Sequence, residues 1–138
     1  MKQVAGKLKL ELAQFAESIP ISIQEDNGSI EGIIHYNMEF VNNWLQSVGA
    51  NINTSNLIPP IAIAKNMWVD EEVRNQGLGT DLINNFIGEA SDMGAKCILL
   101  EADMGEDNAF NLVNWYSSFG FKTIGNGNQY PIMKMDLW

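Results

Sequence analysis

The stretch that decides the fold runs from residue 61 to residue 94 and reads IAIAKNMWVDEEVRNQGLGTDLINNFIGEASDMG. Its first part, residues 61–69, is a mostly apolar run that follows Pro60 and precedes a charged turn, which predicts a long strand. From Leu78 onward, apolar residues recur at helical spacing until Gly94, a residue type suited to the position after a helix end. The stretch therefore predicts a strand, a loop with two glycines and an amphipathic helix.

The rest of the chain adds strands on both sides of this unit. Upstream, the residue pattern predicts strands at 8–12, 19–24 and 30–36, a turn at 25–28 and a helix at 39–48. Downstream, it predicts a strand at 96–102, a helix from Asp107 to Gly120, strands at 121–124 and 132–137, and a turn at 125–128. We expect one α/β (α+β) domain over residues 1–138, a sandwich built on a mixed sheet.

The loop between the strand and the helix is suited to binding a phosphate. Gly77 and Gly79 allow a tight turn that exposes backbone N–H groups at the helix N-terminus, and Arg74, the chain's only arginine, precedes them. A nucleoside-triphosphate loop would need a lysine before Thr80, and a dinucleotide fingerprint would need a small residue where Leu82 stands. The alternative is that both glycines serve only the packing of the helix start.

Two motifs in the second half resemble those of one family. Arg74-x-x-Gly77-x-Gly79 after a strand resembles motif A of the GNAT superfamily of N-acetyltransferases, and residues 116–121, YSSFGF, resemble that family's Tyr-x-x-x-Gly-Phe motif. The resemblance covers roughly residues 58–138. It implies a GNAT-like fold, with a central mixed, mostly antiparallel twisted sheet flanked by helices and a shortened N-terminal part. It also implies acetyl-CoA as cosubstrate, while the residues themselves predict no metal.

The resemblance assigns roles to individual residues. The backbone of Met67 and Val69 would pair with the pantetheine arm of acetyl-CoA. The pyrophosphate would be cradled by Arg74, Asn75, Gln76, Gly77, Leu78, Gly79 and Thr80. The sequence departs from the family where an asparagine often contacts pantetheine, because Ala109 stands there; Asn108 and Asn111 are the nearby candidates, and Asn108 can equally cap the helix.

The resemblance makes Tyr116 the general acid. An amine that attacks a thioester releases a thiolate, and a phenol within reach can supply its proton. The alternative is a core tyrosine on a helix face. Glu101 is the first candidate for the general base, with the alternative of a solvated carboxylate at a strand end. The further candidates for the base are Asp103, Glu39, His35 and Asp70.

Composition limits the partners. The formal net charge is −9 and the pI is about 4.4, which disfavours a nucleic-acid partner or a polybasic membrane contact. Cys97 is the only cysteine and lies in an apolar run, which excludes an internal disulfide and favours a buried thiol. His35 is the only histidine, so no zinc site is expected. With no signal peptide or membrane span predicted, we expect a cytoplasmic protein.

The function predicted is transfer of an acetyl group from acetyl-CoA to a primary amine in a direct ternary complex. The acceptor remains open between a small molecule and a protein lysine or N-terminus. The alternative is a weak or inactive CoA-binding module that acts through protein contacts. The four tryptophans are expected in the core or on the face of a possible homodimer, with stacking on the cofactor as the alternative; they are Trp44, Trp68, Trp115 and Trp138.

Overall fold

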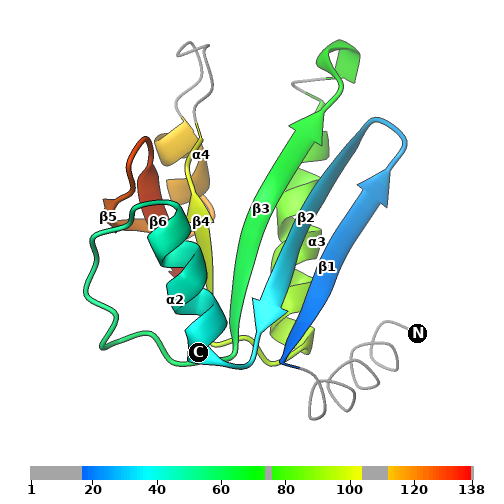
Figure 1. Cartoon of the computed structure of the whole chain (residues 1–138). Coiled ribbons are helices and arrows are strands. Elements are labelled where there is room, and N and C mark those ends of the chain that lie inside the picture. Colours follow the sequence, from blue (N-terminus) through cyan, green and yellow to red (C-terminus); the bar gives the residue numbers. More distant parts are fainter. Residues whose placement is uncertain (1–16, 74–75, 104–111, 138) are drawn as a thin grey trace.

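The computed structural model describes residues 17–73, 76–103 and 112–137 (Figure 1). The strands are β1 (Ser18–Glu25), β2 (Gly28–His35), β3 (Ile61–Val69), β4 (Cys97–Glu101), β5 (Lys122–Asn126) and β6 (Pro131–Asp136). The helices are α2 (Met38–Ser47), the short 3₁₀ helix η1 (Glu71–Val73), α3 (Leu78–Asp92) and α4 (Leu112–Ser117).

The six strands form one sheet in the order β1-β2-β3-β4-β6-β5. Among them β3 and β4 are the parallel pair, and every other neighbouring pair is antiparallel. A parallel pair needs a crossover connection, which α3 supplies between β3 and β4. The structure thus confirms the mixed, mostly antiparallel sheet.

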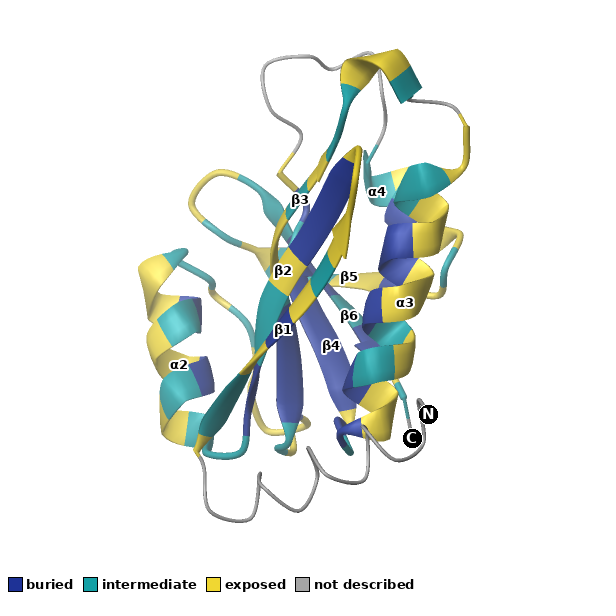
Figure 2. Ribbon diagram, turned by 90° about the vertical axis from the view of Figure 1, so that its right-hand side faces the viewer, coloured by how far each residue is buried: buried dark blue, intermediate teal, exposed yellow. Residues whose placement is uncertain are grey.

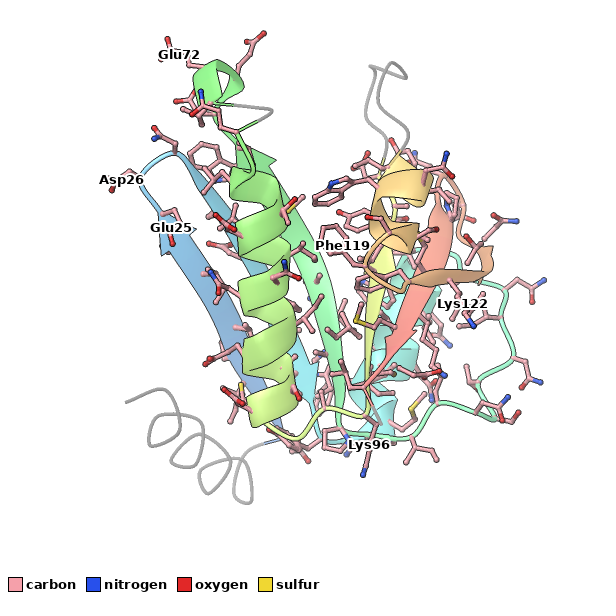
Figure 3. The ribbon with its side chains drawn as sticks, turned by 180° about the vertical axis from the view of Figure 1, so that it is seen from behind. Glu25, Asp26, Glu72, Lys96, Phe119 and Lys122 are labelled. Atoms are coloured by element: carbon pink, nitrogen blue, oxygen red, sulfur yellow. The ribbon has the colours of Figure 1, made fainter. Side chains whose placement is uncertain are left out.

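Helices cover both faces of the sheet. Figure 2 shows α2 on one face and α3 with α4 on the other, and Figure 3 looks onto the face that carries α3 and α4. Ala62, Phe86, Ile98 and Tyr116 belong to the core cluster beneath α3 and α4. Val41, Ile61, Ile63 and Leu99 belong to the second cluster beneath α2. We call these two sides the α3 face and the α2 face.

A bulge in β3 opens the middle of the sheet. Glu31 pairs with Asn66 and Gly32 with Ala64, so Lys65 is an extra residue without a partner on β2. Pairing between β3 and β4 ends at Ala64 and Leu100. Because a bulge bends its strand and increases its twist, β3 leaves β4 at the point where Lys65 is inserted.

Most of the predicted elements are confirmed, and β3 has the predicted bounds. Gly94 has φ +86° and follows the last turn of α3, as expected. α4 ends at Ser117, before the predicted end at Gly120, because a turn intervenes and Gly120 adopts φ +110°. The predicted turn at 125–128 was placed too early, since β5 continues to Asn126. The predicted strand at 8–12 and the cap at Asp107 lie outside the described residues.

Candidate functional site

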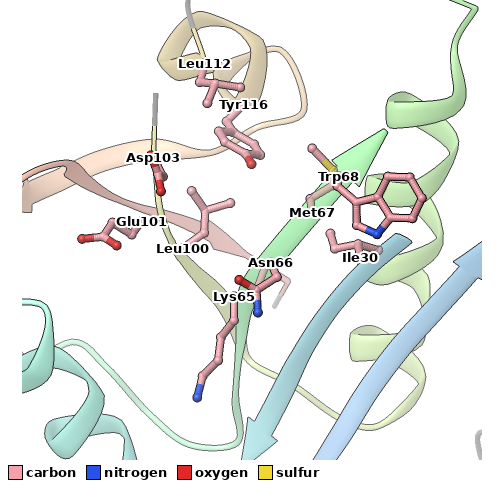
Figure 4. Close-up of a pocket in the computed structure, with 11 residues that line it drawn as sticks. Ile30, Lys65, Asn66, Met67, Trp68, Leu100, Glu101, Asp103, Leu112 and Tyr116 are labelled. Carbon is pink, nitrogen blue, oxygen red and sulfur yellow. The ribbon is translucent and has the colours of Figure 1, made fainter. Parts of the chain in front are cut away.

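A pocket of about 450 Å³ lies where β3 and β4 separate (Figure 4). Its volume falls within the range of small-molecule sites. The lining residues are Ile30 from β2; Ala64, Lys65, Asn66, Met67 and Trp68 from β3; Leu100, Glu101 and Asp103 from β4 and its C-terminal end; and Leu112 and Tyr116 from α4. The pocket therefore brings together Tyr116, Glu101 and Met67, three of the residues predicted for the site.

Tyr116 is held by the turn that follows its helix. Gly120 adopts φ +110°, a backbone conformation that favours glycine. The chain reverses there, so that the backbone N–H of Phe121 donates to the carbonyl of Tyr116. The Phe121 ring then packs edge to face on the Tyr116 ring, with centroids 5.8 Å apart. The Tyr-x-x-x-Gly-Phe motif is thus a device that fixes the orientation of a tyrosine ring.

The phenol of Tyr116 points into the pocket (Figure 4). The side chain is 9% exposed, and burial raises its pKa to about 12, with a smaller contribution from the negative charge of Asp103. A raised phenol pKa keeps Tyr116 protonated throughout the neutral range. The residue is therefore both part of the core, as one prediction had it, and a lining residue of the pocket.

Glu101 reaches the same pocket from the other face of the sheet. Along β4, Cys97 and Leu99 belong to the cluster beneath α2, while Ile98 and Leu100 belong to the cluster beneath α3. Alternation places Glu101 on the α2 face, and Figure 4 shows its carboxylate pointing away from the Tyr116 phenol. Burial, and to a lesser extent Asp103, raises the pKa of Glu101.

The N-terminus of α3 lies at the end of β3 and beside α4. Gly77 is the N-cap with φ +84°, and the N–H of Asp81 donates to the carbonyl of Gly77 in the first turn of the helix. The N–H groups of residues 78–80 therefore have no acceptor within the helix. A Cβ on Gly79 would lie 3.6 Å from the Trp115 ring and 3.8 Å from Val69, which places this helix start against both elements.

The other residues predicted to bind the cofactor lie partly within and partly outside the described chain. Gln76 and Thr80 are exposed beside the helix start, and Leu78 is half-buried. Met67 and Val69 pack on the α3 face. In the described part of the chain, no strand pairs with the β4-facing edge of β3 beyond Ala64. Arg74, Asn75, Asn108 and Asn111 lie outside the described residues, so their roles stay predictions.

The remaining candidates for the base do not line the pocket, with the exception of Asp103. The ring of His35 is buried, stacks on Phe40 with centroids 5.7 Å apart, and its Nδ1 lies 2.6 Å from the Ser18 hydroxyl. Burial lowers the His35 pKa, with a smaller effect from the Lys65 charge. Asp70 accepts a hydrogen bond from the backbone of Glu72, and Glu39 is exposed in the first turn of α2.

Cys97 is buried, as predicted, and burial raises its pKa to about 11. Trp44 and Trp115 pack against the two core clusters, also as predicted. Trp68 is not a core residue, because it is 54% exposed and lines the pocket, and its place on a homodimer face stays a prediction. Trp138 lies outside the described residues.

Lys65 and Asn66 are pocket residues that sequence reasoning missed. A signal for them was present in the run IAIAKNMWV. Before the polar pair Lys65–Asn66, the even-numbered residues Ala62 and Ala64 pack on the α3 face. After it, the odd-numbered residues Met67 and Val69 pack on that face. A change of phase by one residue is what a bulge produces.

Two negative findings concern the described residues. None of their helices is long and apolar enough to cross a membrane. Nor do their histidine, cysteine, aspartate and glutamate side chains form a group of three or more that could hold a metal ion.

Comparisons with known proteins agree with this architecture. The family model described as "Acetyltransferase (GNAT) domain" matches residues 21–123. Curated protein sequences give no match. An acetyltransferase from Bacillus cereus is 16% identical with a TM-score of 0.54, over 97% of this chain and 89% of that one.

Two further structures have the same fold. The ribosomal-protein-S18-alanine N-acetyltransferase from Escherichia coli is 17% identical, with a TM-score of 0.54 over 92% of this chain and 75% of that one. The PaiA N-acetyltransferase from Thermoplasma acidophilum, solved with coenzyme A, is 14% identical, with a TM-score of 0.56 over 92% of this chain and 65% of that one. At these identities the likeness concerns the fold, and the family follows from the match over most of the chain: this protein belongs to the GNAT acetyltransferase family.

Proposed function

We propose that this protein transfers an acetyl group from acetyl-CoA to a primary amine within a ternary complex. One observation carries the proposal: a phenol and a carboxylate, Tyr116 and Glu101, line one pocket from opposite faces of the sheet. Reagents that enter from the two faces would meet in the gap between β3 and β4. Such an arrangement suits direct transfer between two bound substrates.

The residues at the α3 face fit acetyl-CoA. The N–H groups at the start of α3, which have no acceptor within the helix, can hold a pyrophosphate, because they are aligned and lie at the positive end of the helix dipole. From there, the edge of β3 beyond Ala64 leads to the pocket. The backbone of Met67 and Val69 would receive the pantetheine along this edge, as an added strand.

The chemistry then follows from the positions of the two side chains. The amine nitrogen attacks the thioester carbonyl carbon, a C–N bond forms, and the C–S bond breaks with its electron pair on sulfur. Glu101 takes the proton that the amine loses, and Tyr116 gives its proton to the sulfur. The raised pKa of Glu101 makes it a stronger base than an ordinary glutamate, and the raised pKa of Tyr116 keeps its proton in place until the thiolate forms.

A covalent acetyl-enzyme intermediate is disfavoured. The candidate nucleophile would be Cys97, whose thiol is buried beneath α2 and has a pKa of about 11. The thiolate is the reactive form of cysteine, so this side chain stays unreactive at neutral pH.

The test removes the hydroxyl of Tyr116. Thiol release from acetyl-CoA is measured over a panel of amines, together with CoA affinity by calorimetry. Tyr116→Phe keeps the ring contact with Phe121 and should lower kcat by about a hundredfold or more, with little change in CoA affinity.

Tyr36→Phe is the matched control. Its hydroxyl donates to the carbonyl of Met93 at 3.0 Å, so the variant should lose stability and keep kcat. Unchanged kcat in Tyr116→Phe would remove Tyr116 from the chemistry. CoA binding without turnover of any amine in the wild type would contradict the enzymatic function and favour a binding module.

A further inference from the structure

Lys65 occupies a special place in the pocket. It is the inserted residue of the β3 bulge, next to the last residue of β3 that pairs with β4. Bulges commonly re-aim a side chain beside a functional site. In Figure 4, Lys65 extends away from the Tyr116 phenol, and its charge acts on His35, which stacks on Phe40 of α2. The ammonium group therefore lies on the α2 side of the pocket.

No carboxylate of the described residues neutralises Lys65. Lys134, by comparison, pairs with Asp136 at 3.0 Å. Lys65 forms no such ion pair within residues 17–73, 76–103 and 112–137, although the chain carries 17 acidic residues against 8 basic ones. An exposed lysine that lines a pocket and has no ion-pair partner among the described residues can bind an anionic group of a ligand.

The phosphates of CoA do not account for this charge. The proposed phosphate site begins beyond Val69, and four residues of strand span about 13 Å. It also adjoins α4 and the α3 face, whereas Lys65 serves the α2 face. The anion that Lys65 meets therefore belongs to the other substrate, the acceptor.

Glu101 shares the α2 side with Lys65 and lines the same pocket. The two side chains form no ion pair with each other, so a positive and a negative group stand apart there. We propose that Lys65 binds a carboxylate of the acceptor while Glu101 faces its amine, so that the acceptor is a small free amino acid. This inference rests on the proposed acetyl transfer.

Charge balance supports an amino acid over a simple anion or a diamine. A simple anion would match Lys65, but it has no amine to accept the acetyl group and would leave the carboxylate of Glu101 unmatched. A diamine would leave one cation beside the ammonium group of Lys65, a repulsive contact in a partly enclosed site. A zwitterion has no net charge, and its two ends match the two side chains.

The test compares each of the twenty standard L-amino acids with its α-amide, which keeps the amine and lacks the carboxylate. Thiol release should show at least about a tenfold preference in kcat/KM for the best amino acid over its amide. Lys65→Met, which keeps the apolar stem, should remove that preference by raising KM for the acid and should leave the amide unaffected. Lys65→Arg should retain it. Lys122→Met, at an exposed lysine on β5, is the matched control and should behave as the wild type.

A binding measurement separates this inference from the proposed function. The preferred amino acid is titrated by calorimetry into the protein saturated with CoA, where no transfer can occur. If none reacts, each of the twenty is titrated in turn. Binding that Lys65→Met weakens about tenfold supports the inference even if turnover fails. The inference is overturned, and the proposed acetyl transfer is not, if the amides react as fast as the amino acids or if Lys65→Met leaves the affinity for the amino acid unchanged. Failure to bind CoA overturns both.

Discussion

The two faces of the sheet differ where β3 leaves β4. On the α3 face, the site consists of backbone N–H groups, the apolar side chains of Met67 and Leu112, and one buried phenol, Tyr116. On the α2 face, it consists of the charged side chains of Lys65 and Glu101, and the exposed indole of Trp68 lines the pocket farther along β3. The first arrangement is suited to a long ligand that is the same in every reaction and is held largely by the protein backbone. The second is suited to discriminating between small ligands by charge.

The difference also separates two kinds of constraint. On the α3 face, a glycine with positive φ and a tyrosine held by a following Gly-Phe require particular residues at fixed separations in the sequence. The side chains that line the pocket on the α2 face come from separate strands and are brought there by strand register, so they have no fixed spacing in the sequence. Experiments that break one face at a time should therefore give different kinetic signatures.

The largest effect, a loss of CoA affinity, is expected from Gly77→Val, which alters only the α3 face. A Cβ at Gly77 has no neighbour within 4 Å, so the cost comes from φ +84°, which a β-branched residue strongly disfavours. The turn must rearrange, the N–H groups lose their alignment, and CoA affinity should fall by about a hundredfold or more in calorimetry.

Gly88→Val is the matched control for this variant. Gly88 lies within α3, has no positive φ and also has open space around its Cβ position. This variant should change the melting temperature slightly and keep CoA affinity. Equal CoA affinity in both variants would exclude the glycine loop from cofactor binding.

Glu101→Gln alters the α2 face and should give the next largest effect, a loss of kcat. The proposed base is lost, so kcat should fall by about a hundredfold with CoA affinity unchanged. Because burial and Asp103 raise the Glu101 pKa, the carboxylate loses its proton only at a pH above the ordinary glutamate range. Wild-type kcat should therefore decline as pH falls through that raised pKa, and the variant should lack this decline. Glu39→Gln, an exposed glutamate on α2, should retain it.

Much of the fold could be predicted from the sequence because its signals are local. The alternation in 19–24 and the helical spacing from Leu78 to Gly94 match β1 and α3 closely. The end of α4 was misjudged because Gly120 closes a turn after the helix. A glycine marks the change of backbone direction, but it does not show whether the residues before it are helical.

The α3 face of the site could also be predicted, whereas most of the α2 face could not. Tyr116 and the helix start belong to motifs with fixed spacing, and both lie at the proposed site. Glu101 was predicted from its place at a strand end and lines the pocket, but that position does not specify which face of the sheet its side chain is on. Lys65 was missed because its role depends on a bulge, and the register that creates the bulge involves β2, more than thirty residues away in the chain.

Asp103→Asn should couple the two faces with a smaller effect. The charge of Asp103 raises the pKa of both Glu101 and Tyr116, although burial is the larger cause for each. Removing that charge lowers both pKa values, so the acidic decline of kcat should move to lower pH by less than about one unit. Asp92→Asn, at the end of α3, is the control, and the same acceptor is used throughout so that its own titration cancels. A shift toward higher pH would contradict the electrostatic assignment.

The smallest effect concerns the acidic end of the molecule near the proposed phosphate site. Glu71 and Glu72 form η1 directly after β3, and the N–H of Asp70 donates to the carbonyl of Asn27 at 2.7 Å, which ties η1 to the β1–β2 turn. Figure 3 shows Glu25, Asp26 and Glu72 at this same end. Their charges repel the phosphates of CoA, but water and salt screen exposed groups strongly. Glu71→Gln with Glu72→Gln should therefore raise CoA affinity about two- to threefold at low salt and leave the acceptor KM unchanged. The gain should vanish in about 0.5 M salt, where the screening length falls to a few ångströms; a gain that persists there would mean that the two glutamates act through local structure rather than through charge.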